Sequence, residues 1–164
     1  AIVKLLILTG QRRNEIASLR AEYVKDSVCT LPSGLTKNKR DHAFPLGVCA
    51  VNIISSYAFK PGLLFPARGS RESPFNGWSK SKAALDRGLG SSVEPWTLHD
   101  LRRYFASTMA RLGVRQEVTE RLLNHRSGII SGIAAVYTLH DFMPEMRAAI
   151  EKYESFLHSI AVAG

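Results

Sequence analysis

The stretch TGQRRNEIASLR contains an arginine that is well placed to bind an anion. Arg12 follows a glycine at a predicted corner between two helices, where its guanidinium can bind two phosphate oxygens at once. Glu15, three residues later, can hold that guanidinium in one orientation or serve as an ordinary helix cap. Taken alone, the stretch is better explained as a basic turn.

A second stretch, TLHDLRRYFAS, contains a histidine and an arginine at helical spacing. His99 and Arg102 share one face of a predicted helix and lie in its first turns, where free backbone N–H groups favour an anion. This arrangement is half of a phosphate site. In isolation, however, local packing of His99 and pairing of Arg102 with Asp100 explain the motif better.

The order of the motifs along the chain favours a single phosphate site. TG-x-R-x-x-E, the basic tract TKNKRD, H-x-x-R, LNH and a downstream tyrosine follow one another. In this order they resemble the catalytic domain of the tyrosine site-specific recombinases, the phage integrase family, over essentially all 164 residues. The contexts AAVY and PFNGWSKSKAALDR are similar to integrases of genomic islands and prophages.

The resemblance implies which residues stabilise the phosphate. Arg12 and Arg102 would supply fixed cations, without a metal or other cofactor, to the charge that grows as phosphorus becomes five-coordinate. Glu15 would support Arg12. His125 of LLNH would donate a hydrogen bond to a non-bridging oxygen, and the residue before it is Asn124 where the family commonly has glycine.

The same resemblance implies a nucleophile and a proton donor. Tyr137 of AAVYTLHD would attack phosphorus with help from His99, because a phenol with a pKa of ~10 is a poor nucleophile unaided. Lys37, eight residues before the proline of FPL, would protonate the leaving 5′ oxygen, and Lys39 is its nearest rival. The product would be a 3′-phosphotyrosyl link that a second 5′ hydroxyl can reverse.

The expected function is therefore integration or excision of a mobile element at attachment sites in double-stranded DNA. The resemblance further implies a tetrameric synapse and DNA-bending accessory proteins, and a cytoplasmic, nucleoid-associated prokaryotic location. Candidate DNA-backbone contacts are Arg13, Lys39, Arg40 and Arg103.

Three alternatives compete with this interpretation. A type IB topoisomerase uses a similar tyrosine and arginine set to relax supercoils. A metal-dependent phosphohydrolase would use His99 and Asp100 with His125 and Asp141 as further ligands. A non-catalytic module would only dock helices on the duplex.

Composition agrees with a nucleic-acid partner. The chain has 22 Lys and Arg against 14 Asp and Glu, a formal net charge of +8. It has no apolar run long enough for a membrane span and no charged-then-apolar leader, so we expect a soluble protein with no membrane contact. Cys29 and Cys49 have no spacing typical of a disulfide framework or a zinc site.

The elements that position these motifs predict an α+β fold, mainly α with a small antiparallel β-sheet, as in recombinase catalytic domains. Helical periodicity precedes Gly10, and a helix runs from the N-cap Thr97 to the stop at Gly113. SVCTL and HAFPL predict strands that flank the lysine-bearing turn, and the last helical pattern is interrupted near Pro144. We expect residues 1–164 to form a single catalytic domain, without an amino-terminal DNA-binding domain.

Overall fold

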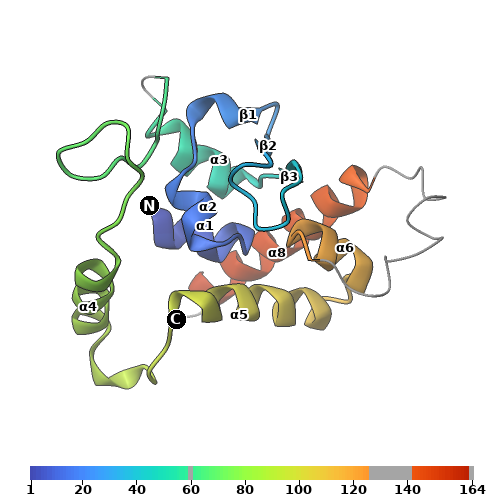
Figure 1. Ribbon diagram of the computed structural model, residues 1–164. Helices are drawn as coiled ribbons and strands as arrows, with labels where there is room; N and C mark the ends of the chain where they lie inside the picture. Colours follow the sequence, from blue (N-terminus) through green and yellow to red (C-terminus); the bar gives the residue numbers. More distant parts are fainter. Residues whose placement is uncertain (59–60, 126–141, 163–164) are drawn as a thin grey trace.

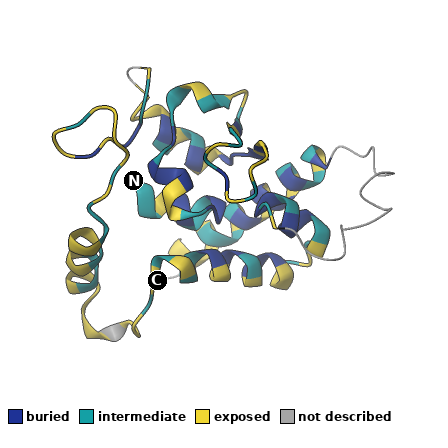
Figure 2. Ribbon diagram, viewed as in Figure 1, coloured by how far each residue is buried: buried dark blue, intermediate teal, exposed yellow. Residues whose placement is uncertain are grey.

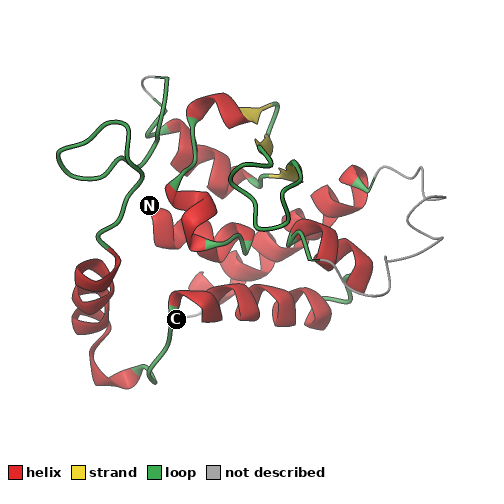
Figure 3. Cartoon of the chain, viewed as in Figure 1, coloured by secondary structure: helices red, strands yellow, loops and turns green. Residues whose placement is uncertain are grey.

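The computed structural model describes residues 1–58, 61–125 and 142–162. The fold is mainly helical with one small antiparallel sheet, so the predicted fold class is confirmed (Figures 1 and 3). The elements are α1 (Ile2–Thr9), α2 (Arg13–Ala17), the 3-10 helix η1 (Ala21–Tyr23), β1 (Val24–Lys25), β2 (Val28–Leu31), β3 (His42–Pro45), α3 (Val48–Ser55), α4 (Trp78–Leu89), the 3-10 helix η2 (Gly90–Ser92), α5 (Leu98–Arg111), α6 (Gln116–Leu122) and α8 (Met143–Val162).

The three-stranded sheet is ordered β1-β2-β3 and presents one face to the core. Cys29 pairs with Phe44 and Leu31 pairs with His42, and all four side chains are buried. Because side chains alternate along a strand, this register directs both strands' apolar positions to one side. The predicted lysine-bearing turn is the long loop, residues 32–41, that joins β2 to β3.

The corner after α1 is a tightly packed turn. Gly10 ends α1 in the left-handed conformation, with φ 64°, and its N–H donates to the carbonyl of Leu6. A β-carbon at this position would lie 2.7 Å from the ring of Phe105 on α5 and 2.9 Å from Leu123. The glycine predicted as a helix stop thus also lets α5 and the end of α6 approach the Arg12 corner.

The carboxyl-terminal helix α8 packs against α5, α6 and β3. Tyr153 is fully buried, with its ring 4.7 Å from that of Phe105, and its hydroxyl donates to the carbonyl of Ile7 at 3.0 Å. Pro144 lies in the first turn of α8, where a missing N–H costs nothing, so the predicted interruption is the start of the helix. Among the helices within the described ranges, none is long and apolar enough to cross a membrane.

Helix α4 differs from the other described α-helices because none of its residues is buried. Figure 1 shows it standing apart from the helices of the core, and Figure 2 shows that it is exposed along most of its length. The core therefore does not determine which residues α4 carries, although the beginning of this helix reaches the cleft described below.

We expect Gly10→Ala to lower the free energy of unfolding by about 3 kcal/mol, the sum of left-handed strain and overpacking against Phe105. Urea denaturation measures the change. Gly113→Ala is the matched control, because Gly113 also has a positive φ of 72° but has open space where a β-carbon would stand. Gly113→Ala should lower the free energy of unfolding by about 1 kcal/mol. Equal decreases in the two variants would contradict the packing argument.

Candidate active site

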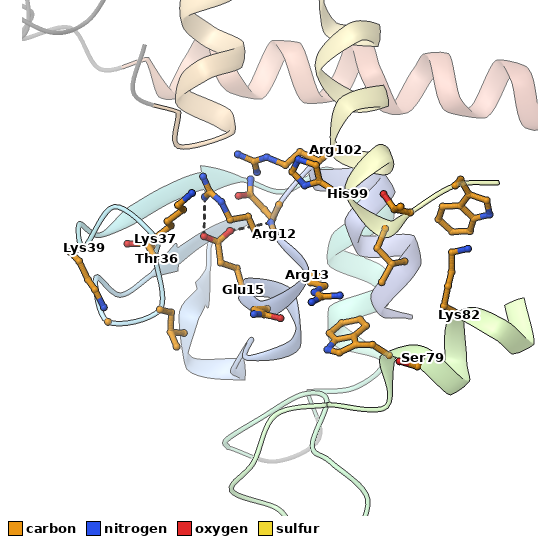
Figure 4. Close-up of a pocket in the computed structure, with 18 residues that line it drawn as sticks. Arg12, Arg13, Glu15, Thr36, Lys37, Lys39, Ser79, Lys82, His99 and Arg102 are labelled. Carbon is orange, nitrogen blue, oxygen red and sulfur yellow. Dashed lines mark hydrogen bonds and ion pairs between the residues drawn. The ribbon is translucent and has the colours of Figure 1, made fainter. Parts of the chain in front are cut away.

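A basic cleft of about 810 Å³ lies where α2, the loop of residues 32–41, the beginning of α4 and the beginning of α5 meet (Figure 4). Glu15 is the one acidic side chain in its lining. The cationic side chains that line it are Arg12, Arg13, Lys37, Lys39, Lys82 and Arg102. Such a concentration of positive charge in one concave surface favours a polyanion.

Arg12 is held at the start of α2 by a single carboxylate. The Glu15 side chain accepts a hydrogen bond from the Arg12 backbone N–H and forms an ion pair with the Arg12 guanidinium, both at 3.1 Å. Glu15 is buried, whereas the Arg12 side chain is 24% exposed. Capping and orientation, which the sequence left as alternatives for Glu15, are therefore performed by the same side chain, and the rest of the guanidinium faces the cleft.

Arg102 is fixed more rigidly than Arg12. It is only 4% exposed, and its guanidinium donates to the carbonyl of Gly10 at 2.7 Å and to the carbonyl of Leu123. Burial, and secondarily the charge of Arg12, lower the pKa of Arg102 to about 10, so it remains a cation at neutral pH. Two guanidiniums that repel each other across a cleft form a site that an anion stabilises.

Both candidate histidines lie within the electrostatic reach of the arginine pair or line the cleft with it. His99, exposed in the first turn of α5, lines the cleft with Arg102. His125 follows the end of α6, where its backbone N–H donates to the carbonyl of Glu120 at 2.8 Å. Burial, followed by the positive charges of Arg102 and Arg12, lowers the pKa of His125, so this imidazole lies within the field of both arginines.

The basic residues of the loop are not equivalent. Lys37 and Lys39 both line the cleft, but Figure 4 shows Lys37 extending toward Arg12 and Lys39 extending away from it. Arg40 is exposed and does not line the cleft. Lys37, expected to be the proton donor, is thus the lysine that extends toward Arg12, and its role stays a prediction.

The remaining predicted residues fall in different places. Arg13 lines the cleft with its guanidinium 5.7 Å from the ring centroid of Trp78. Arg103 lies outside the cleft lining, is exposed and pairs with Asp100 at 2.7 Å. Tyr137 and Asp141 lie outside the residues that the structure describes.

Asp100, on which the metal-site alternative is centred, caps the start of α5 together with Thr97. Its carboxylate accepts hydrogen bonds from the backbone N–H and the hydroxyl of Thr97 at 2.8 and 2.7 Å, in addition to the Arg103 ion pair. These bonds lower the pKa of Asp100 to about 2. In the described ranges, no three His, Cys, Asp or Glu side chains are grouped closely enough to hold a metal ion.

Two buried polar residues near the arginines were not predicted from the sequence. Gln11 donates to the carbonyl of Leu122 at 2.8 Å and to that of Thr9 at 3.2 Å. His42, 5% exposed on β3, has its Nε2 3.2 Å from the same Leu122 carbonyl. No motif near either residue in the sequence indicates its role, because both contacts with the Leu122 carbonyl join segments 80 or more positions apart.

An aromatic rim on the α4 side was also missed. Lys82 lies 4.1 Å from the ring centroid of Trp96 and forms an ion pair with Asp86. Trp78 and Trp96 both line the cleft. Basic and aromatic side chains are the combination that binds nucleic-acid backbone and exposed bases, and the spacing of two tryptophans around a predicted helix could have indicated it.

We expect His42 to make stability depend on pH. Burial lowers its pKa from 6.5 to about 4, so between these values the unfolded chain binds the proton more readily than the folded chain. The free energy of unfolding should therefore fall by about 3 kcal/mol as the pH drops from 6.5 to 4. Urea denaturation across this range measures the slope.

His42→Gln is the matched variant, because its amide nitrogen can reach the Leu122 carbonyl without titrating. Its stability should change less with pH, while His125 contributes a residual slope in the same direction. An unchanged slope in His42→Gln would show that other groups are responsible.

The chain is similar to known integrases in sequence. The sequence profile of the Phage integrase family matches residues 1–142, a range that includes Tyr137. The prophage integrase IntZ of Escherichia coli is 28% identical over an alignment that covers 96% of this chain and 39% of IntZ. The tyrosine recombinase XerD of Mycobacterium tuberculosis is 27% identical over an alignment that covers 85% of this chain and 48% of XerD.

Solved structures share the fold. The integrase of mycobacterium phage Brujita superposes with a TM-score of 0.71 at 19% identity, covering 93% of this chain and 50% of that one. The Tn1549 transposon integrase in complex with circular intermediate DNA superposes with a TM-score of 0.57 at 15% identity, covering 90% of this chain and 55% of that one. The chain spans less than half of the length of the two curated relatives. Because the family profile matches residues 1–142, the chain belongs to the phage integrase family.

Proposed function

We propose that this chain carries the catalytic centre of a site-specific DNA recombinase that cuts and rejoins DNA strands through a 3′-phosphotyrosyl intermediate. The observation that carries the proposal is the meeting of Arg12 and Arg102 in one basic cleft, joined there by His99 and Lys37. These residues come from segments that are distant in sequence, and the fold brings them to the same surface.

The two arginines perform the electrostatic part of the reaction. A phosphodiester gains negative charge on its non-bridging oxygens as it becomes five-coordinate, and Arg12 and Arg102 stay cationic and oriented in advance. His125, whose pKa is lowered beside them, is mostly neutral at pH 7 and donates a hydrogen bond to the same oxygens. The protein's own cations supply the stabilisation, which makes cleavage independent of a metal ion.

The proton steps balance without a cofactor. The Tyr137 oxygen attacks phosphorus as its proton passes toward His99, the bond from phosphorus to the 5′ oxygen breaks, and Lys37 gives that oxygen a proton. The phosphotyrosyl bond retains the energy of the broken phosphodiester. A 5′ hydroxyl from a second strand therefore reverses the step and completes strand exchange without ATP.

The surroundings of the cleft are suited to duplex DNA. Arg13, Lys39 and Lys82 extend the positive charge outward from the arginine pair, and Trp78 and Trp96 add apolar surface. Backbone contacts of this kind give salt-dependent affinity with little sequence preference of their own. Arg40 and Arg103, which are exposed outside the lining, are proposed to make further contacts with the duplex backbone.

The wider setting follows from the same chemistry. Exchange between two duplexes requires four strand cleavages, so we expect a tetramer of this protein on paired attachment sites, with DNA-bending proteins assisting where the sites must be brought together. The proposed setting is the nucleoid in a prokaryotic cytoplasm, and the element moved is a prophage or genomic island.

The nucleophile is tested by trapping. The substrate is a pool of nicked duplexes with randomised base pairs around the nick. Cleavage near the nick releases a short strand with a 5′ hydroxyl, which diffuses away and cannot reverse the reaction. The protein therefore stays covalently attached to the sequences that it prefers. We expect a protein–DNA adduct that survives denaturing electrophoresis, that forms in EDTA and that Tyr137→Phe abolishes with unchanged DNA affinity. An adduct that persists in Tyr137→Phe would refute the assignment, and sequence-independent relaxation of a supercoiled plasmid would indicate topoisomerase activity.

The phosphate clamp is tested by separating cleavage from binding. Arg12→Ala should lower the single-turnover cleavage rate at saturating DNA by about 100-fold or more, with a much smaller change in affinity. Arg12→Lys should recover only part of the rate, because an ammonium keeps the charge but not the two-pronged donor geometry. Arg111→Ala, an exposed arginine at the far end of α5, is the control and should change neither quantity appreciably. Parallel losses of rate and affinity in Arg12→Ala would indicate general electrostatics instead.

A further inference from the structure

The carboxyl end of α6 is bound by side chains from several separate segments. The last carbonyls of a helix have no partner within it, so they must accept hydrogen bonds from elsewhere. Here the Leu122 carbonyl contacts Gln11 and His42, and the Leu123 carbonyl accepts from Arg102. The next carbonyl, that of Asn124, accepts from Asn38 of the loop between β2 and β3, at 2.8 Å.

The Asn38 contact is double. Its side-chain nitrogen donates to the Asn124 carbonyl at 2.8 Å and also to the Asn124 side-chain oxygen at 3.0 Å, across 86 positions of sequence. Asn38 directly follows Lys37, and Asn124 directly precedes His125. One amide group therefore joins the loop that carries the candidate proton donor to the segment that carries a candidate phosphate ligand.

The other hydrogen bonds of the loop fix its shape but not its place. The Thr36 hydroxyl donates to the Arg40 carbonyl at 2.7 Å and accepts from the Arg40 N–H at 3.2 Å. The Ser33 N–H donates to Asp41 at 2.8 Å. These bonds lie within residues 32–41, so they would survive a movement of the whole loop away from the cleft, whereas the Asn38 bonds would not.

We propose that Asn38 is a positioning residue that fastens the loop of residues 32–41 to the end of α6, and thereby holds Lys37 at the leaving-group side of the cleft. The inference rests on the proposed function, in which Lys37 protonates the 5′ oxygen. It deepens that function, because proton donation then depends on Asn124, and so on the segment that positions His125.

The conformation of Asn124 suits this role. Its φ of 50° is in the left-handed region, which asparagine tolerates better than most residues and which glycine adopts freely. A glycine here would keep the backbone carbonyl that accepts at 2.8 Å and would lose the side-chain oxygen that accepts at 3.0 Å. Asn124→Gly therefore removes one of the two hydrogen bonds, whereas Asn38→Ala removes both.

The chemistry of the leaving group supplies a readout that a general structural defect would not move. With oxygen as the bridging atom, cleavage transfers one proton from the lysine to the 5′ oxygen as the bond to phosphorus breaks. With sulfur in the 5′-bridging position, the strand leaves as a stable thiolate and needs no proton. A variant defective only in proton donation therefore recovers on the sulfur substrate.

The experiment compares single-turnover cleavage of the duplex selected by trapping, made with either bridging oxygen or bridging sulfur. With oxygen, we expect Asn38→Ala to cleave about 10- to 100-fold more slowly than the unaltered chain, because a displacement of about 1 Å costs on that order. Lys37→Ala should be slower still, and Asn124→Gly intermediate. With sulfur, all three should return to within about 3-fold of the unaltered chain, an expectation that follows from the proton-transfer argument.

Controls separate this inference from its alternatives. Asn52→Ala, at an exposed site on α3 outside the cleft lining, should match the unaltered chain with both substrates. Arg12→Ala should stay slow with both, because it lacks transition-state charge and not a proton. Thermal denaturation of Asn38→Ala should give a transition close to that of the unaltered chain.

Each other outcome has a definite meaning. If Asn38→Ala is equally slow with both substrates, or normal with oxygen, Asn38 does not position the donor and the inference fails while the proposed function stands. If Lys37→Ala is not rescued by sulfur, Lys37 is not the proton donor, and the general-acid assignment falls together with this inference. Rescue of Lys39→Ala in its place would move the donor role to Lys39.

Discussion

The architecture of the cleft depends on the burial of one guanidinium. Arg102 is almost removed from solvent, and a buried cation is tolerated only when its donors are satisfied. The carbonyls that satisfy it belong to Gly10, at the corner after α1, and to Leu123, at the end of α6. The need to solvate this charge with backbone oxygens therefore brings three helices to one point, and the corner that carries Arg12 comes with them.

The surrounding residues reduce the cost of placing positive charges so close together. Glu15, buried beneath Arg12, supplies one compensating carboxylate. His42, which lies in the field of both arginines, is kept neutral because burial and their charges lower its pKa to about 4. A neutral imidazole still contacts the Leu122 carbonyl, so the hydrogen bond is retained without adding a third cation.

The parts of this site that the sequence predicted are those with a local signal. Helical spacing placed His99 and Arg102 on one face, and Gly10 and Thr97 marked a helix end and a helix start where the structure has them. The antiparallel strands around the lysine-bearing turn were likewise predicted from composition and turn residues. What made these local features into one site was their order along the chain, because no single motif outweighed a surface explanation.

The residues that hold the site together were not predictable in this way. Asn38 resembles any polar loop residue, and Gln11 resembles any neighbour of a basic turn, until their partners at the end of α6 are known. Every residue has a backbone carbonyl, so the identity of the accepting residue does not reveal a long-range hydrogen bond to it. Such bonds depend on the tertiary structure and cannot be recognised in the sequence. The separate position of α4 was missed for a related reason, since its pattern indicates a helix but not what the helix packs on.

The meeting of so many contacts at α6 affects how substitutions combine. This helix has only seven residues, and its Val118 and Leu122 side chains are its apolar anchors in the core. A change that slides α6 along its axis displaces the acceptors of Gln11, His42, Arg102 and Asn38 together. Double-mutant cycles between an α6 core position and any of these donors would then be strongly non-additive, and remote packing defects would mimic the loss of a reacting group.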